Sequence, residues 1–185
     1  MQLYLMRHGI AGQHGDPHYP NDDERPLTKK GVKKLEEQLP GLQEFGVKPD
    51  LIIASPLARA RQTAAIIAQG LRLADHRDNA ARHAYVADER LAPGASADDL
   101  LLVIETHLTE EMRQRQPDDQ ELQIMIISHE PDLSQAAAQL SGGLGDIWLR
   151  KGGLIRLDLG SLASRRGVLR WLLEPEHLQI RKGKA

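Results

Sequence analysis

Three short, almost uninterrupted runs of apolar residues recur along this chain of 185 residues, at positions 3–6, 51–55 and 124–128. A strand that is covered on both faces shows such a continuous run, whereas a half-exposed strand alternates apolar and polar residues. Stretches with a helical spacing of apolar residues separate the three runs. This alternation predicts an α/β fold, in which helices flank a mostly parallel sheet to form a three-layer sandwich.

The helical stretches carry start and stop signals. Residues 32–42 have apolar residues close to helical spacing, and we expect Pro40 to kink or split this helix. We expect Ser55 to cap the second helix and Ser96 to cap the third, because a serine oxygen can accept from the free N–H groups of the first turn. A further helix is expected directly after residue 128.

Length and composition bound the class of protein. The chain is long enough for one domain, so we expect a single domain over residues 1–185. Within it we expect a hairpin of strands at 154–159 and 168–174, followed by a flexible tail from about 175. The formal net charge of −2 argues against general affinity for nucleic acid. No stretch resembles a signal peptide or a membrane span, and the lack of cysteine excludes disulfides and thiolate sites. We expect a cytoplasmic protein that binds neither nucleic acid nor membranes.

Cationic and imidazole side chains follow each of the three apolar runs. Arg7 and His8 follow the first run, Arg59 lies in the first turn after the second, and His129 follows the third. Ligands bind beyond the carboxyl ends of the strands in sheets of this kind. We therefore expect these four side chains to converge at one edge of the sheet.

The four residue types suit the chemistry of a phosphate group. Arginine grips a phosphate dianion through two parallel hydrogen bonds, and a neutral imidazole such as that of His8 can attack phosphorus. A second imidazole, that of His129, can donate to a phosphate oxygen and offset the charge that develops during transfer. We expect Gly9 to let the backbone pass close to the bound phosphate.

Three stretches resemble the signatures of a known family. "LMRHG", "SPLARARQT" and "ISHEP" are similar to those of the histidine phosphatase superfamily, which has the phosphoglycerate-mutase-like fold. The stretches 25–31 ("RPLTKKG") and 88–94 ("DERLAPG") resemble its small SixA-like branch, the phosphohistidine phosphatases. The resemblance covers residues 1–159 and implies a mixed sheet, a transiently phosphorylated His8, and a phosphate pocket formed by Arg7, Arg59 and His129. It implies no metal and no other cofactor.

The acid that would protonate the leaving group is left open. Glu89 lies at the position where the resemblance implies a carboxylate, and its alternative role is to cap or pair near the following turn. Glu130 is adjacent to His129, and its alternative role is to open the following helix, where a carboxylate suits the helix dipole. Asp22 and its acidic neighbours, within the long polar loop 10–26, are expected to form a solvated face.

We therefore expect a metal-independent phosphatase that works through a phosphohistidine intermediate. The preferred substrate is phosphohistidine on a protein, because the short chain leaves little length for a lid over a small molecule. The resemblance suggests a histidine phosphotransfer domain as this protein. The first alternative is a small-molecule phosphomonoesterase whose substrate is enclosed by loop 10–26, and mutase activity ranks after it. The second alternative is a non-catalytic phosphate-binding module.

Overall fold

The computed structural model describes residues 1–71, 85–114, 121–143 and 145–179. Within these ranges the strands form one sheet, in the order β3-β2-β4-β1-β5-β6. The strands are β1 (Gln2–Arg7), β2 (Leu51–Ala54), β3 (Val86–Ala87), β4 (Gln123–Ser128), β5 (Leu154–Leu159) and β6 (Gly167–Leu173). The first four strands are parallel, whereas β5 runs antiparallel to β1, and β6 to β5. The mostly parallel mixed sheet and its terminal hairpin confirm the predicted α/β fold.

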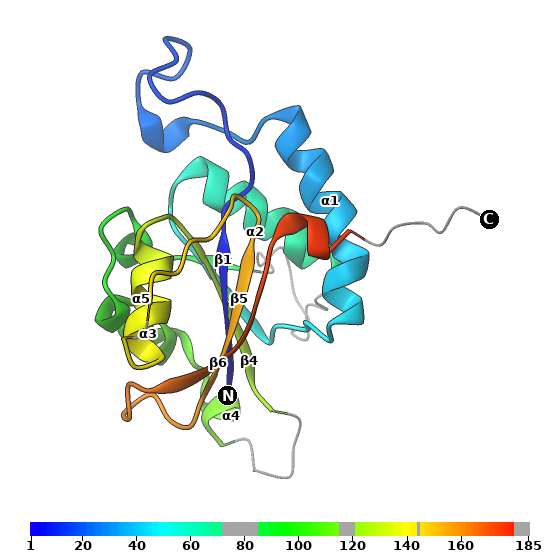
Figure 1. The fold of residues 1–185 in the computed structure, drawn as a ribbon. Coiled ribbons are helices and arrows are strands. Elements are labelled where there is room, and N and C mark those ends of the chain that lie inside the picture. Colours follow the sequence, from blue (N-terminus) through cyan, green and yellow to red (C-terminus); the bar gives the residue numbers. More distant parts are fainter. Residues whose placement is uncertain (72–84, 115–120, 144, 180–185) are drawn as a thin grey trace, which may run out of the picture.

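Helices cover both faces of the sheet, which makes three layers (Figure 1). Helices α1 (Lys29–Glu44) and α2 (Ala58–Gly70) pack on one face, whereas α3 (Ala97–His107) and α5 (Asp132–Leu140) pack on the other. Side chains of β1 alternate between the two cores, Leu3 and Leu5 in one and Tyr4 and Met6 in the other. Short helices complete the described part, namely α4 (Glu110–Arg113), η1 (Asp22–Glu24), η2 (Glu89–Leu91) and η3 (Pro175–His177). No helix in these ranges combines the length and apolarity that crossing a bilayer requires.

Two of the expected helix signals differ from the structure. Helix α1 is not split at Pro40, since buried residues on both sides of this exposed proline, such as Leu35 and Leu42, hold the helix against the core. Helix α2 begins after Leu57 and not after Ser55, whose hydroxyl is engaged elsewhere, as described below. Ser96 does cap α3, and a reciprocal contact with Asp99 completes a capping box.

The chain remains packed beyond the expected start of the tail. Residues Pro175–His177 form η3, and the side chain of Leu178 is fully buried in the same core as α1. A Cβ placed on Gly41 of α1 would lie only 2.0 Å from the carbonyl oxygen of Leu178, so glycine is required for this contact. The first residues of the expected tail are therefore packed against α1, and residues 180–185 lie outside the described part.

Candidate active site

The parallel pairing of the central strands brings the predicted site residues together. Arg7 and Ser128, the last residues of β1 and β4, are direct partners in the sheet, so His8 and His129 leave neighbouring strands at the same level. The two imidazole rings have centroids 5.2 Å apart. Arg59 lies in the first turn of α2, and its charge acts on both imidazoles, so all four side chains lie together at the carboxyl edge of the sheet.

His8 is held through one ring nitrogen, and its other ring nitrogen has no hydrogen bond to the described residues. Its Nδ1 lies 2.7 Å from the carbonyl oxygen of Gly9, and because a carbonyl only accepts, Nδ1 carries the proton. The lone pair is therefore on Nε2. Burial, together with the charges of Arg59 and Arg7, lowers the pKa of His8 to about 3, so the imidazole is neutral at pH 7. A neutral, oriented imidazole is what nucleophilic attack on phosphorus requires.

His129 is equally buried and faces the same space. Its Nε2 lies 2.8 Å from the hydroxyl oxygen of Ser55, the residue that follows β2. Among the described residues its Nδ1 has no hydrogen-bond partner although the atom is buried. Burial and the charge of Arg59 lower the pKa of His129 to about 3. The side chain is thus a neutral imidazole with one uncommitted ring nitrogen inside the site.

Arg7 is anchored by only part of its guanidinium group. Its Nη1 donates to the carbonyl oxygen of Leu149 at 2.8 Å, and its buried Nε has no partner in the described part of the chain. No carboxylate of the described residues lies within ion-pair distance of Arg7. Unused donors on a half-buried cation suit an anionic ligand.

Arg59 is paired with a residue that the sequence analysis assigned to a solvated face. Its Nη2 lies 3.1 Å from the Asp22 carboxylate, and its Nη1 donates to the Asp22 carbonyl oxygen at 2.9 Å. The same carboxylate accepts from Nε of Arg25 at 2.7 Å and lies 2.8 Å from Nδ1 of His14. The hydrogen bond from Arg25, followed by that of His14, holds the pKa of Asp22 well below its usual range. The solvated face was therefore a wrong expectation for Asp22.

Arg25 is a site residue that sequence reasoning missed. It is only 8% exposed, and its Nη1 donates to the carbonyl oxygen of Gly12, across loop 10–26. Its charge acts on His129, which places a third guanidinium group beside the site. The available signal was the stretch 25–31, which the sequence analysis used only as support for a family branch.

Gly9 has a packing role at the end of β1, and its expected approach to the phosphate stays a prediction. Its N–H donates to the hydroxyl oxygen of Thr63 at 3.0 Å, so this group is already used. A Cβ at this position would lie 2.7 Å from a methyl carbon of Leu35, so glycine allows α1 to pack against the end of β1. Because Thr63 also donates to the carbonyl oxygen of Arg59, the glycine links two of the site segments.

The two candidate acids differ in their surroundings. Glu89 opens η2 directly after β3, at the edge of the sheet that carries the site, and its side chain is exposed. The alternative capping role belongs to its neighbour Asp88, whose side chain accepts from the backbone and the side chain of Arg90. Glu130 precedes α5, which begins at Asp132, and burial raises the pKa of Glu130.

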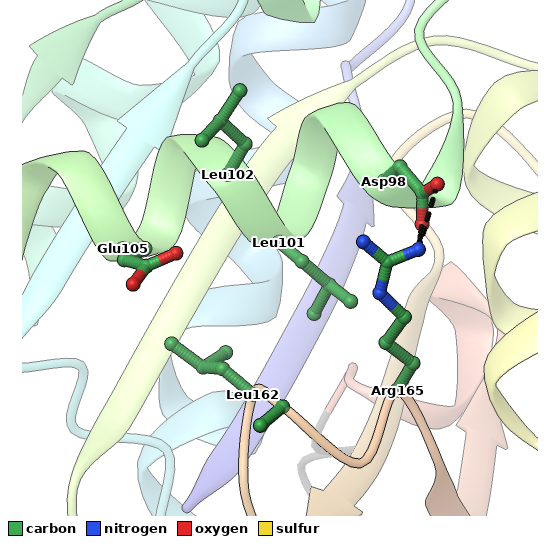
Figure 2. Close-up of a pocket in the computed structure, with 7 residues that line it drawn as sticks. Asp98, Leu101, Leu102, Glu105, Leu162 and Arg165 are labelled. Carbon is green, nitrogen blue, oxygen red and sulfur yellow. Dashed lines mark hydrogen bonds and ion pairs between the residues drawn. The ribbon is translucent and has the colours of Figure 1, made fainter.

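Two observations concern the rest of the described surface. No cluster of three or more histidine, cysteine or acidic side chains there has the arrangement of a metal site. A pocket lies between α3 and the turn that joins β5 to β6 (Figure 2), where Arg165 pairs with Asp98 at 2.8 Å. None of the predicted site residues lines this pocket, whose lining consists of Asp98, Leu101, Leu102, Glu105, Leu162, Ala163 and Arg165.

The low pKa values of the two site histidines predict a loss of stability in acid. The unfolded chain binds a proton at each imidazole below pH about 6.5, whereas folded His8 and His129 resist protonation down to about pH 3. The free energy of unfolding should therefore fall as the pH falls through this window, by about 1.4 kcal/mol per pH unit for each histidine. Between pH 6 and 4.5, the free energy of unfolding measured with urea should depend less steeply on pH for the double variant His8→Gln and His129→Gln than for the wild type. Equal slopes would contradict the neutral state of both rings.

Comparison with known proteins agrees with this geometry. The model of the histidine phosphatase superfamily (branch 1) matches residues 3–121. An uncharacterized protein of Picosynechococcus sp. (strain PCC 7002) is 33% identical over 163 residues, which cover 87% of each chain. Among solved structures, the protein histidine phosphatase SixA complexed with tungstate has a TM-score of 0.73 at 21% identity, covering 96% of this chain and 99% of the other. A mycobacterial glucosyl-3-phosphoglycerate phosphatase with inorganic phosphate has a TM-score of 0.65 at 17% identity, covering 95% and 98%.

Proposed function

The chain belongs to the histidine phosphatase superfamily (branch 1), and on this premise we propose that it hydrolyses phosphohistidine on a protein, through a phosphohistidine intermediate at His8 and without a metal ion. The observation that carries the proposal is the state of His8. It is buried and neutral, its Nε2 lone pair is free, and two arginines and a second imidazole surround it. A module that only binds phosphate has no need of such an imidazole, which argues against the non-catalytic alternative.

In the proposed first step, Nε2 of His8 attacks phosphorus in line with the leaving group. The bond from Nε2 to phosphorus forms while the bond from phosphorus to the substrate nitrogen breaks, and the electron pair leaves with the substrate imidazole. Arg7 and Arg59 hold the phosphoryl oxygens, where preorganised charge stabilises the transition state. With Ser55 donating to Nε2 of His129, the Nδ1–H of His129 is available to a phosphoryl oxygen.

In the second step, water attacks the phosphorylated His8. The oxygen of water bonds to phosphorus while the bond from Nε2 to phosphorus breaks, so that Nε2 regains its lone pair and both protons of water leave with the inorganic phosphate. Arg59 keeps donors for the phosphoryl oxygens while it is paired with Asp22. The two contacts with Asp22 use one N–H on Nη1 and one on Nη2, and Nε has no partner among the described residues.

The preference for a protein substrate draws support from the similarity to SixA, whose structure is described as that of a protein histidine phosphatase. The partner in this proposal is a protein that presents a phosphohistidine side chain, such as a histidine phosphotransfer domain. A small-molecule phosphomonoesterase is the second candidate, because the similarity to the phosphatase of glucosyl-3-phosphoglycerate covers nearly the same share of this chain as the similarity to SixA does. Location in the cytoplasm stays a prediction.

A side-by-side assay separates the candidate functions. We expect the enzyme to hydrolyse a phosphohistidine protein with a higher kcat/KM than any member of a panel of alkyl and aryl phosphates, and we expect EDTA to leave the rate unchanged. A higher kcat/KM for an alkyl phosphate would overturn the protein substrate and favour the second candidate. Loss of activity in EDTA that a divalent ion restores would overturn the metal-free mechanism.

Glu89→Gln tests which leaving group the site serves. A phosphohistidine whose other ring nitrogen is protonated leaves as neutral imidazole, with a conjugate-acid pKa of roughly 6.5, and needs little help. An alkoxide is a far stronger base and needs a proton in the transition state. We therefore expect the substitution to leave phosphohistidine hydrolysis nearly unchanged and to lower alkyl phosphate turnover by about 10²- to 10⁴-fold. Equal losses on both substrates would show that Glu89 acts on binding or structure, and no loss on either would remove it from the mechanism.

A further inference from the structure

The segment before β5 crosses the end of β1 and is tied to the site by its backbone (Figure 1). The Gly152 N–H lies 3.1 Å from the carbonyl oxygen of Arg7 and 3.2 Å from that of His8, and the Arg7 N–H donates to the carbonyl oxygen of Gly153 at 3.1 Å. Gly152 has a φ of +82°, a conformation that glycine adopts without strain. The backbone of this segment is thus held next to the nucleophile.

Two side chains of the segment lie close to the cations of the site. The guanidinium carbon of Arg7 lies 5.8 Å from the centroid of the Trp148 ring, within the range of a cation–π contact. Burial, followed by the charges of Arg7 and the other site arginines, lowers the pKa of Lys151. The segment is therefore part of the rim of the site, although the sequence analysis assigned no role to Trp148.

Trp148 is the most exposed large apolar side chain of the described residues, at 65%. The Arg7 guanidinium contacts it twice, since it lies against the ring and also donates to the carbonyl oxygen of the adjacent Leu149. An aromatic ring that is exposed beside the group holding the phosphate can contact the part of the substrate to which the phosphate is attached. Flat rings stack on tryptophan more favourably than alkyl chains do.

We propose that Trp148 is a specificity-determining residue, which stacks on the planar ring of the leaving group and selects phosphorylated imidazoles and aryl phosphates over ringless substrates. This inference rests on the proposed phosphatase activity but not on phosphohistidine as its substrate. Stacking at the rim acts on the bound substrate and on the transition state alike, so it lowers KM and leaves kcat unchanged. A tryptophan that merely positioned Arg7 would act on every phosphate ester to the same degree.

The test compares Trp148→Ala with the wild type on two matched pairs of substrates. N-phosphoimidazole and phosphoramidate both have a bond from phosphorus to nitrogen, and only the first has a ring. Phenyl phosphate and glycerol phosphate form the corresponding pair with a bond to oxygen. We expect kcat/KM to fall by about 3- to 10-fold on the two ring substrates, through KM, and to stay within about twofold on the other two. Trp148→Phe should restore most of the loss.

Leu102→Ala is the matched control, because Leu102 is an exposed apolar residue on α3 and lines a pocket apart from the site. It should leave all four substrates unchanged. An equal loss on ring and ringless substrates, or no loss on either, would overturn the role of Trp148. If the enzyme fails to cleave the two nitrogen-linked substrates, the phosphohistidine function fails, and the oxygen-linked pair still decides the role of Trp148.

Discussion

His8→Ala should abolish turnover, with a loss on the order of 10⁴-fold or more, the scale seen when a covalent nucleophile is removed. The variant keeps the arginines and His129, so it should still bind phosphate or vanadate. Its fold should survive, because the substitution removes a buried polar ring and leaves the sheet pairing of β1 intact. Steady-state hydrolysis of phenyl phosphate, together with circular dichroism, separates loss of chemistry from loss of structure.

His177→Ala is the control for this prediction. His177 lies in η3, is exposed, and interacts with the backbone of Glu174 outside the site. Turnover of this variant should equal that of the wild type. If the folded His8→Ala enzyme retained more than a few per cent of the activity, His8 would not be the nucleophile.

Arg59→Ala should lower kcat/KM by about 10²- to 10³-fold, the scale for removing one preorganised charge stabiliser. Arg59 is 4% exposed and its charge acts directly on His8. Lysine should not restore the rate, because one ammonium group cannot replace two parallel guanidinium donors. Vanadate, which mimics five-coordinate phosphorus, should inhibit the variant far less than the wild type.

Arg61 provides the matched control on the same helix. It lies two residues further along α2 and its side chain is exposed. Arg61→Ala should change kcat/KM by less than about twofold, since a surface charge pair contributes little. Comparable losses in the two variants would show that the net charge of α2 matters and that Arg59 has no special contact with phosphate.

The sheet and the four converging side chains could be predicted from the sequence because they follow from a periodic signal. A parallel strand covered on both faces needs a continuous apolar run, and the residue after each run must emerge at the same edge. Arg7, His8 and His129 each stand directly at such a strand end. Ser55 also stands there, but the sequence analysis assigned its hydroxyl to a helix cap and missed its contact with His129.

The parts of the site that could not be predicted depend on side-chain pairing in loops, which has no period. The contacts of Asp22 with Arg25 and Arg59 form because loop 10–26 folds back over the first turn of α2, and local sequence does not encode that return. The position of Trp148 likewise depends on the long-range hydrogen bond between Arg7 and Leu149. Pro40 shows the converse, since tertiary packing carries α1 through a residue that local propensity would make a break.

Trapping the phosphoenzyme tests the central claim most directly. The enzyme is mixed briefly with a substrate labelled in its phosphoryl group, quenched in alkali, which preserves the bond between nitrogen and phosphorus, and digested for mapping. The account predicts one labelled site, His8, with label that appears within a single turnover, is lost on acid treatment and is absent from His8→Ala. Label on a different residue, or complete turnover with no labelled protein at any time, would contradict the account.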